Sequence, residues 1–227
     1  MNDCLWCNQA IIYQPSWRHL FTFVERTTLC DDCQSELELL NGKRCVKCSR
    51  KSDMERCLDC QYWSEKLGKD PLTANISVYS YNERMREMIA KWKYRGDYEL
   101  VYAFRPMFVK VFKNHFLTQL KNFIIVPIPL SEMRLHERGF NQADALARLL
   151  PYYQPSILKR LHSEKQAKKT RYERMQTKNP FKLVEPINKP VILVDDIYTT
   201  GTTLRHAARL LKNNGCPEVY GYTLVRG

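Results

Sequence analysis

The chain has 227 residues, enough for one or two domains with a buried core, and it carries 36 Lys and Arg against 24 Asp and Glu. No window approaches roughly 18 consecutive apolar residues, which argues against a transmembrane helix, and the first residues, MNDCLWCNQ, do not resemble a secretory signal. We therefore expect a cytoplasmic protein whose cysteines stay reduced.

The net charge of +12 belongs to the second part of the chain. Residues 1–70 hold 10 basic and 11 acidic side chains, whereas residues 71–227 hold 26 and 13. Such an excess of positive charge is typical of proteins with phosphate-rich partners such as nucleic acids. Ordinary solubility is the alternative explanation.

Eight of the nine cysteines form four C-x2-C pairs near the start of the chain. Each pair presents two sulfurs to a tetrahedral metal, so two pairs complete a Cys4 site. No position is left for water, which predicts structural zinc. The simplest pairing is sequential, with Cys4, Cys7, Cys30 and Cys33 at one site and Cys45, Cys48, Cys57 and Cys60 at another. An interleaved pairing, a disulfide scaffold and an iron–sulfur cluster are the alternatives.

The cysteine pairs predict a zinc-binding domain over residues 1–66 and a second domain over residues 72–227. A Zn(Cys)4 unit is doubly negative, so we do not expect the main nucleic-acid surface on the first domain. Cys216, the ninth cysteine, is interpreted as an ordinary small packed residue.

The second domain alternates strand-like and helix-like segments, which predicts an α/β fold with a largely parallel sheet flanked by helices. The expected strands are 75–81, 123–126, 181–185, 191–194 and 219–225. Helices are expected after Asn82 as an N-cap, after Asp97 with an interruption or kink near Pro106, over 137–150, and from Gly201 to Gly215.

The stretch VILVDDIYTTGTTL, residues 191–204, places two carboxylates and a threonine-rich loop between a buried strand and a helix. Loops at the carboxyl ends of parallel strands are where ligands bind. Amides and hydroxyls over Thr199–Thr203 can converge on an anion, helped by the helix dipole. Asp195 and Asp196 can accept hydrogen bonds from vicinal hydroxyls or take a hard cation through water. Together they suit a ribose 5-phosphate.

Two other interpretations of this stretch remain. VILVDD alone could be the Walker B strand of an ATPase, but no G-x-x-x-x-G-K-[ST] motif occurs in the chain. The loop could also be structural, with its polar side chains simply solvated.

VILVDDIYTTGTT resembles the signature of type I phosphoribosyltransferases, which bind phosphoribosyl pyrophosphate (PRPP) with Mg²⁺. The resemblance implies that Asp195 and Asp196 contact the ribose hydroxyls. It also implies that the 5-phosphate lies in a loop made by Thr199, Thr200, Gly201, Thr202 and Thr203.

VPIPLSEMRLHERGFNQADALA, residues 126–147, resembles a segment of the ComF/ComFC competence proteins, and KWKYRGD and the cysteine-rich head fit that family too. The loop after Pro127 opens at the same sheet edge as the aspartates. By analogy with phosphoribosyltransferases, pyrophosphate or phosphate binds there, with donors from Arg134, Arg138, Asn141 and Gln142. For Asn141 and Gln142, helix capping and packing are the alternative.

Residues 159–182 carry 9 basic and 2 acidic side chains. In phosphoribosyltransferases a loop at this place often closes over PRPP, so a lid is one hypothesis. Contact with a nucleic-acid backbone is another, and a solvated charge run is the third. The candidates for nucleic-acid contact in this segment are Lys165, Lys168, Lys169, Arg171 and Arg174.

KWKYRGDY, residues 91–98, interleaves basic and aromatic side chains, which favours base stacking beside phosphate contacts. It adds Lys91, Lys93 and Tyr94 as nucleic-acid candidates. Trp92 continues the apolar face of its helix and is expected in the core, whereas Lys93 and Tyr94 are expected to be exposed.

The ComFC resemblance implies a cytoplasmic factor for DNA uptake in natural transformation, recruited to the uptake machinery at the membrane. Such a factor binds single-stranded DNA and a PRPP-like ligand and works with a ComFA-like helicase. The alternative is an active type I phosphoribosyltransferase that uses Mg-PRPP and an unidentified acceptor. A third hypothesis is an interaction module whose zinc head docks the helicase.

Overall fold

The computed structural model describes residues 2–11, 27–117, 121–155, 157–161 and 179–227. Its centre is a sheet of four parallel strands in the order β3 (Asn75–Ser80), β8 (Val219–Arg226), β7 (Val191–Tyr198) and β4 (Ile124–Pro127). Most residues of the two inner strands are buried, as expected for a parallel sheet covered on both faces. The predicted α/β fold is confirmed.

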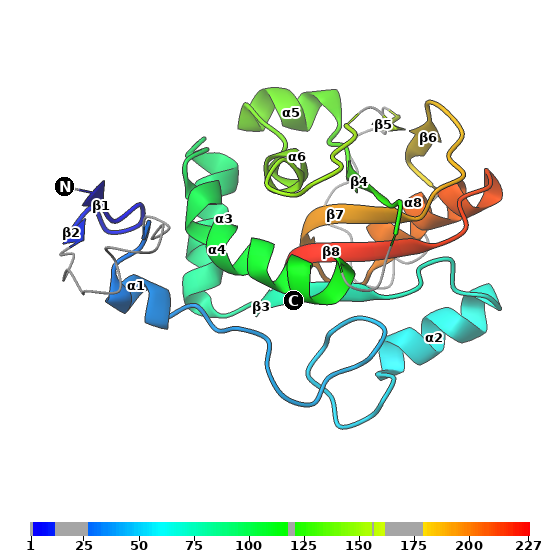
Figure 1. The fold of residues 1–227 in the computed structure, drawn as a ribbon, viewed down its shortest axis with the longest axis horizontal. Helices are drawn as coiled ribbons and strands as arrows, with labels where there is room; N and C mark the ends of the chain where they lie inside the picture. The colour runs from blue at the N-terminus through cyan, green and yellow to red at the C-terminus, as the bar shows by residue number, and fades with distance from the viewer. Residues whose placement is uncertain (1, 12–26, 118–120, 156, 162–178) are drawn as a thin grey trace.

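Helices cover both faces of the sheet (Figure 1). Ile125, Ile192 and Val194 pack toward one face, which is covered by α3 (Glu83–Tyr94), α4 (Leu100–Phe112), η2 (Lys113–Leu117) and α6 (Gln142–Ala147). Val191 and Leu193 pack toward the other face, against α8 (Thr202–Asn213). Alternate residues of one strand thus build two separate cores.

Several helices begin and end where local chemistry predicts. Asn82 caps α3 by accepting a hydrogen bond from the N–H of Met85 (2.9 Å). The helix after Asp97 is α4, and the interruption expected near Pro106 does not occur, because α4 continues past the proline.

The single helix expected over 137–150 is wrong. It is divided into α5 (Glu132–Arg138) and α6, because Gly139 is left-handed (φ 77°) and ends α5. Asn141 is extended and caps α6 by accepting from the N–H of Ala143 (3.0 Å).

A two-stranded antiparallel ribbon lies outside the main sheet. It pairs β5 (Leu158–Arg160) with β6 (Phe181–Leu183). The expected strand over 181–185 therefore exists in shortened form, but it does not join the parallel sheet.

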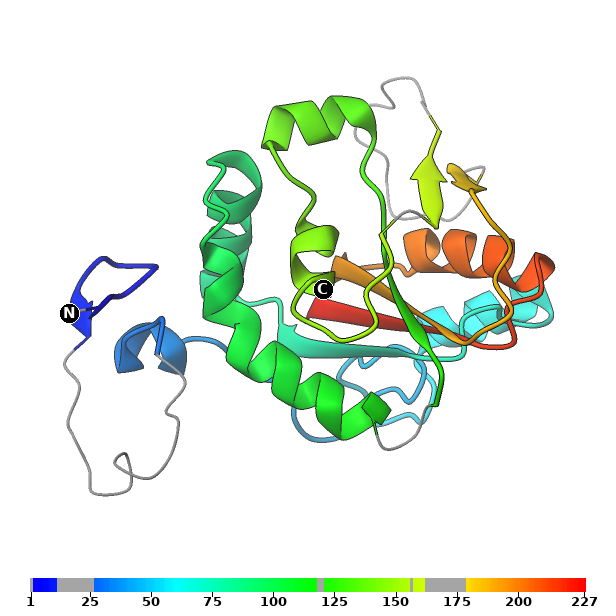
Figure 2. The same ribbon diagram turned by 45° about the horizontal axis from the view of Figure 1, so that its top comes forward.

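The two halves of the cysteine-rich region lie in different places (Figures 1 and 2). The first half, with β1 (Asn2–Asp3), β2 (Ala10–Ile11) and α1 (Asp31–Ser35), packs beside α3 and α4. The second half ends in α2 (Leu58–Leu67) and packs on the face of the sheet that carries α8. The hydroxyl of Ser49 there donates to the carbonyl of Asn75 in β3 (2.8 Å).

Candidate functional site

Asp195 and Asp196 lie in the second half of β7, which extends four residues beyond the expected strand 191–194. The strand continues through Tyr198, since Asp195 pairs with Thr223 of β8. The N–H of Asp196 donates to Oδ1 of Asp195 (2.9 Å). The acidic pair therefore sits at the carboxyl edge of the sheet, where open parallel sheets bind ligands.

Lys93, from the last turn of α3, partly neutralises this pair. Its Nζ makes an ion pair with Oδ2 of Asp196, and the two side chains are 13% and 14% exposed. Burial, followed by the charge of Asp196, raises the pKa of Asp195 to about 7, while Lys93 and Arg160 oppose the rise. Asp195 thus changes charge near neutral pH. The expectation that Lys93 is exposed is wrong, because its side chain is only 13% exposed.

The threonine loop turns sharply at Gly201, where φ is 74°. A Cβ atom there would lie 2.2 Å from the hydroxyl of Tyr198 and 2.3 Å from Nη1 of Arg205, so only glycine fits. The hydroxyls of Thr200 and Thr202 are 2.9 Å apart and buried, and α8 begins at Thr202 with no capping side chain among the described residues. An uncapped helix start beside hydroxyls can receive an anion.

Arg134 and Arg138 both lie on α5, Arg134 in its first turn and Arg138 as its last residue. Arg134 is exposed, whereas Arg138 donates to Oε1 of Gln142 (3.0 Å). Gln142 is 1% exposed, and its Nε2 has no partner among the described residues. Asn141 caps α6 and donates from Nδ2 to the carbonyl of Ile128 (3.0 Å), which matches its capping alternative. Ligand contact by these residues stays a prediction.

The basic and aromatic residues at the end of α3 separate into core and surface. Trp92 is fully buried, as expected, and Tyr94 is 75% exposed. The guanidinium of Arg138 lies over the Tyr94 ring, 5.7 Å from its centroid. Lys91 makes an ion pair with Asp97 (3.1 Å). The other nucleic-acid candidates, Lys165, Lys168, Lys169, Arg171 and Arg174, lie outside the described residues.

The cysteines form two groups of four with the sequential pairing. The sulfur atoms of Cys4, Cys7, Cys30 and Cys33 all lie within 4.8 Å of one another, as do those of Cys45, Cys48, Cys57 and Cys60. Ligands about 2.3 Å from a tetrahedral zinc are about 3.8 Å apart. The Cys7–Cys30 and Cys48–Cys57 sulfur distances of 3.7 and 3.6 Å fit that geometry. Four thiols, with no other donor grouped with them among the described residues, suit structural zinc, which would tie the loops together.

The second cysteine group is the more deeply placed. All four of its cysteines are buried, whereas Cys7 of the first group is exposed. The N–H of Cys57 donates to the sulfur of Cys45 (3.4 Å). A hydrogen bond from Cys60, together with the charge of Arg226, lowers the pKa of Cys48 to about 4. Cys216 is buried elsewhere, and its thiol donates to the carbonyl of Lys189 (3.1 Å).

Residues 112–227 match the family model of the phosphoribosyl transferase domain. The chain is also 39% identical to the competence protein ComFC of Bacillus subtilis, over 98% of this chain and 94% of that one. This chain belongs to the ComFC family of competence proteins. ComFC of Streptococcus pneumoniae is 31% identical over 98% and 99% of the two chains, and the DNA utilization protein YhgH of Escherichia coli is 27% identical over 87% and 96%.

One solved structure, a hypoxanthine phosphoribosyltransferase from Staphylococcus aureus, aligns with 57% of this ComFC-family chain, and the alignment covers 64% of that enzyme's chain. The sequence identity is 16% and the TM-score is 0.33, too low to support an inference. Among the described helices of this ComFC-family chain, none is long and apolar enough to span a membrane.

Sequence reasoning missed Arg160 in this ComFC-family chain. Arg160 lies in β5, with its guanidinium over the ring of Phe181 (5.6 Å). Burial, then the charge of Arg134, lowers the pKa of Arg160, and Asp195 opposes this. Burial and nearby positive charges also lower the pKa of His206 to about 4, so that ring is neutral at pH 7. In the sequence, Arg160 is one of nine basic residues in the segment 159–182. Only the fold brings it near the acidic pair.

Proposed function

We propose that this ComFC-family chain handles single-stranded DNA in natural transformation, with one face that binds the strand and a PRPP-like ligand. The relatives' names, competence and DNA utilization proteins, support a role with DNA. One contact carries the proposal: Arg138, a candidate for phosphate binding, lies on Tyr94, a candidate for base stacking.

The PRPP-like ligand is proposed to bind across the end of β7 and the start of α8. Asp195 and Asp196 would accept hydrogen bonds from the ribose hydroxyls or hold Mg²⁺ through water. The threonine loop would hold the 5-phosphate at the uncapped start of α8. Arg134, Arg138 and Arg160 would contact the pyrophosphate. Their forked donors match phosphate oxygens, and Mg²⁺ would neutralise part of the ligand's charge.

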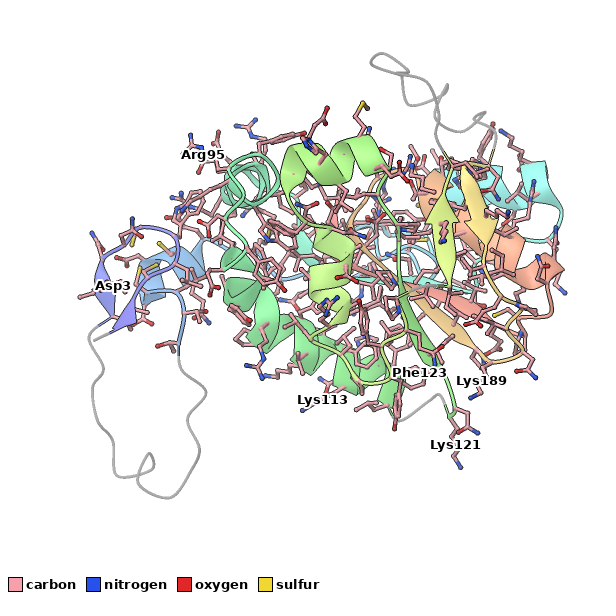
Figure 3. The ribbon with its side chains drawn as sticks, turned by 90° about the horizontal axis from the view of Figure 1, so that it is seen from above. Asp3, Arg95, Lys113, Lys121, Phe123 and Lys189 are labelled. Carbon is pink, nitrogen blue, oxygen red and sulfur yellow. The ribbon has the colours of Figure 1, made fainter. Side chains whose placement is uncertain are left out.

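The DNA strand is proposed to run over the ends of α3 and α5. Tyr94 offers a face on which a base can stack, and the neighbouring Arg95 is exposed. Figure 3 shows Arg95 at the end of α3, while Lys121 and Lys189 lie toward the opposite edge of the sheet. Because Lys93 connects this surface to Asp196, strand and ligand would meet at the acidic pair.

The remaining features of the proposal come from the family. We propose two structural zinc ions, one in each cysteine group, and a ComFA-like helicase as the protein partner. A cytoplasmic location with recruitment to the uptake machinery would bring the chain to the incoming strand.

A titration with labelled single-stranded DNA tests this function. The zinc-loaded protein is titrated at several salt concentrations, with and without Mg-PRPP. Steep salt dependence is expected, because neutralised phosphates release counterions. Mg-PRPP should change the affinity in the wild type, and Asp195→Asn/Asp196→Asn should abolish that change.

The matched control is Asp31→Asn/Asp32→Asn, which removes two adjacent exposed carboxylates from α1. With zinc content unchanged, it should keep the response to PRPP. Absent or salt-independent DNA binding would contradict the proposal, and so would a PRPP response that survives in Asp195→Asn/Asp196→Asn.

An active phosphoribosyltransferase is the second candidate, favoured by the family match over residues 112–227. An acceptor nucleophile would form a bond to the anomeric carbon of PRPP, and pyrophosphate would leave with the electron pair. Positioning and charge stabilisation would carry the catalysis. Pyrophosphate release is measured with Mg-PRPP and a panel of bases and amines, and no release with any of them would count against this candidate.

A further inference from the structure

The second cysteine group is joined to the threonine loop by Arg226, the last residue of β8. Arg226 is 5% exposed. Its Nε donates to the carbonyl of Cys48 (3.0 Å), and its Nη2 lies 3.6 Å from the Cys48 sulfur. Its Nη1 donates to the carbonyls of Tyr198 (3.0 Å) and Thr199 (3.1 Å). One buried guanidinium therefore holds a cysteine of the group and the start of the loop together.

Trp63 makes a second connection. It follows Cys60 by one turn of α2, and its Nε1 donates to the carbonyl of Thr200 (2.8 Å). The guanidinium of Arg205 lies 4.9 Å from the centre of the indole ring. Arg205 in turn donates to Asp70 (2.8 Å) and to the hydroxyl of Tyr198 (2.7 Å). The loop thus rests on a buried layer of polar contacts.

These contacts determine which way the loop's backbone faces. Arg226 and Trp63 hold the carbonyls of three consecutive residues, Tyr198–Thr200. No peptide bond of the described chain is cis, and in a trans peptide the N–H points opposite to the C=O. Holding these carbonyls on the side of the cysteine group therefore turns the following N–H groups to the other side, where an anion would bind.

We infer that the second cysteine group positions the threonine loop through Arg226 and Trp63. A metal held by this group would keep both side chains in place, because Arg226 donates to Cys48 and Trp63 lies one turn after Cys60 on the same helix. Loss of the metal would release the loop. Conversely, an anion in the loop would slow loss of the metal, since coupling between two sites is reciprocal. Only this last step rests on the proposed function.

Hydrogen exchange without ligand tests the connection. Exchange of the peptide that contains residues 199–203 is measured in zinc-loaded wild type, Arg226→Gln and Trp63→Phe, and zinc release to a chromogenic chelator is followed on the same samples. Trp63→Phe keeps a ring but loses the N–H. We expect exchange about tenfold faster in Arg226→Gln and about fivefold faster in Trp63→Phe, with one phase of zinc release faster in both.

Arg84→Gln is the control, because Arg84 stacks on Trp6 beside the first cysteine group (5.3 Å). It should leave exchange in the loop unchanged. Wild-type exchange in Arg226→Gln and Trp63→Phe would overturn the inference, as would faster exchange with both zinc-release phases unchanged. If Arg226→Gln does not fold, Trp63→Phe decides.

Adding Mg-PRPP to the wild type separates this inference from the proposed function. Slowing of the affected phase of zinc release, with the other phase unchanged, supports the coupling of the two sites. PRPP binding without any effect on zinc release contradicts it. No PRPP binding, together with the expected exchange results, overturns the proposed ligand but leaves the positioning role standing.

Discussion

The chemistry of Asp195 and Asp196 depends on side chains far away in sequence. Lys93 comes from α3 and Arg160 from β5, and both act on the acidic pair. The motif around the aspartates predicted two carboxylates at the end of a strand, followed by a threonine-rich loop that leads into a helix, and the structure has this order. The motif alone could not predict that burial raises the pKa of Asp195, because burial depends on what packs over the strand.

We expect Asp195→Asn to flatten the dependence of stability on pH. The pKa of Asp195 is about 7 in the folded protein and lies near 4 in an unfolded chain, so folding favours the protonated form. The resulting stabilisation is complete below the unfolded pKa and is lost as pH rises through about 7. Between pH 6 and 8 the wild type should lose about 1 kcal/mol.

The dependence is measured by urea unfolding between pH 6 and 8. At lower pH, protonation of the thiolates would release metal and complicate the comparison. Asp31→Asn, at an exposed site, should keep the wild-type slope. A slope in Asp195→Asn equal to that of the wild type would contradict the prediction.

At the scale of elements, short-range signals decided where helices end. The apolar spacing over 137–150 favours one helix, but Gly139 and Asn141 divide it into α5 and α6. β7 is longer than its apolar run, because β8 continues to pair with it beyond Val194. The point where pairing between two strands ends depends on the neighbouring strand, so the apolar run of one strand does not predict it.

Gly201→Ala should destabilise the protein by more than the strain of a left-handed backbone conformation alone would. Its Cβ would collide with Tyr198 and Arg205, in addition to the strain at φ 74°. We expect a loss of about 2–3 kcal/mol in the free energy of unfolding. PRPP binding, if present, should fall at least about tenfold.

Gly42→Ala is the matched control, because Gly42 has φ 79° with no atom within 4 Å of an added Cβ. It should cost only about 1 kcal/mol. Thermal unfolding measures the stability of both variants, and calorimetric titration measures their affinity for PRPP. Equal losses of stability in the two variants would show that the close contacts at Gly201 do not affect stability.

At the scale of the whole molecule, the two cysteine groups have different neighbours. The first packs beside α3 and α4 at one side of the fold, and the second belongs to the core on the α8 face of the sheet. The predicted boundary between residues 66 and 72 therefore divides segments that are in close contact, as the hydrogen bond from Trp63 to Thr200 illustrates.

Losing the second metal site should destabilise the α/β fold more than losing the first. We expect Cys48→Ser to lower the Tm by roughly 5 °C or more, because it breaks a buried group that supports the sheet and Arg226. Cys7→Ser, at an exposed ligand position, should have a smaller effect on the main transition. Thermal unfolding followed by circular dichroism compares the two variants, with the zinc content of each measured. An equal or larger fall in Tm for Cys7→Ser would contradict the prediction.

The sequence by itself determined the fold class, the buried position of Trp92 and the loop at Gly201, and it favoured the sequential cysteine pairing, which the structure then selected over the interleaved one. Each of these depends on local spacing or on the conformation that one residue type allows. Only the tertiary structure decided that Lys93 pairs with Asp196, that Arg160 acts on the same site, and that Arg226 joins Cys48 to the threonine loop. These contacts connect segments distant along the chain, and their energies depend on burial and alignment, which exist only once the sheet and its two covering layers have assembled.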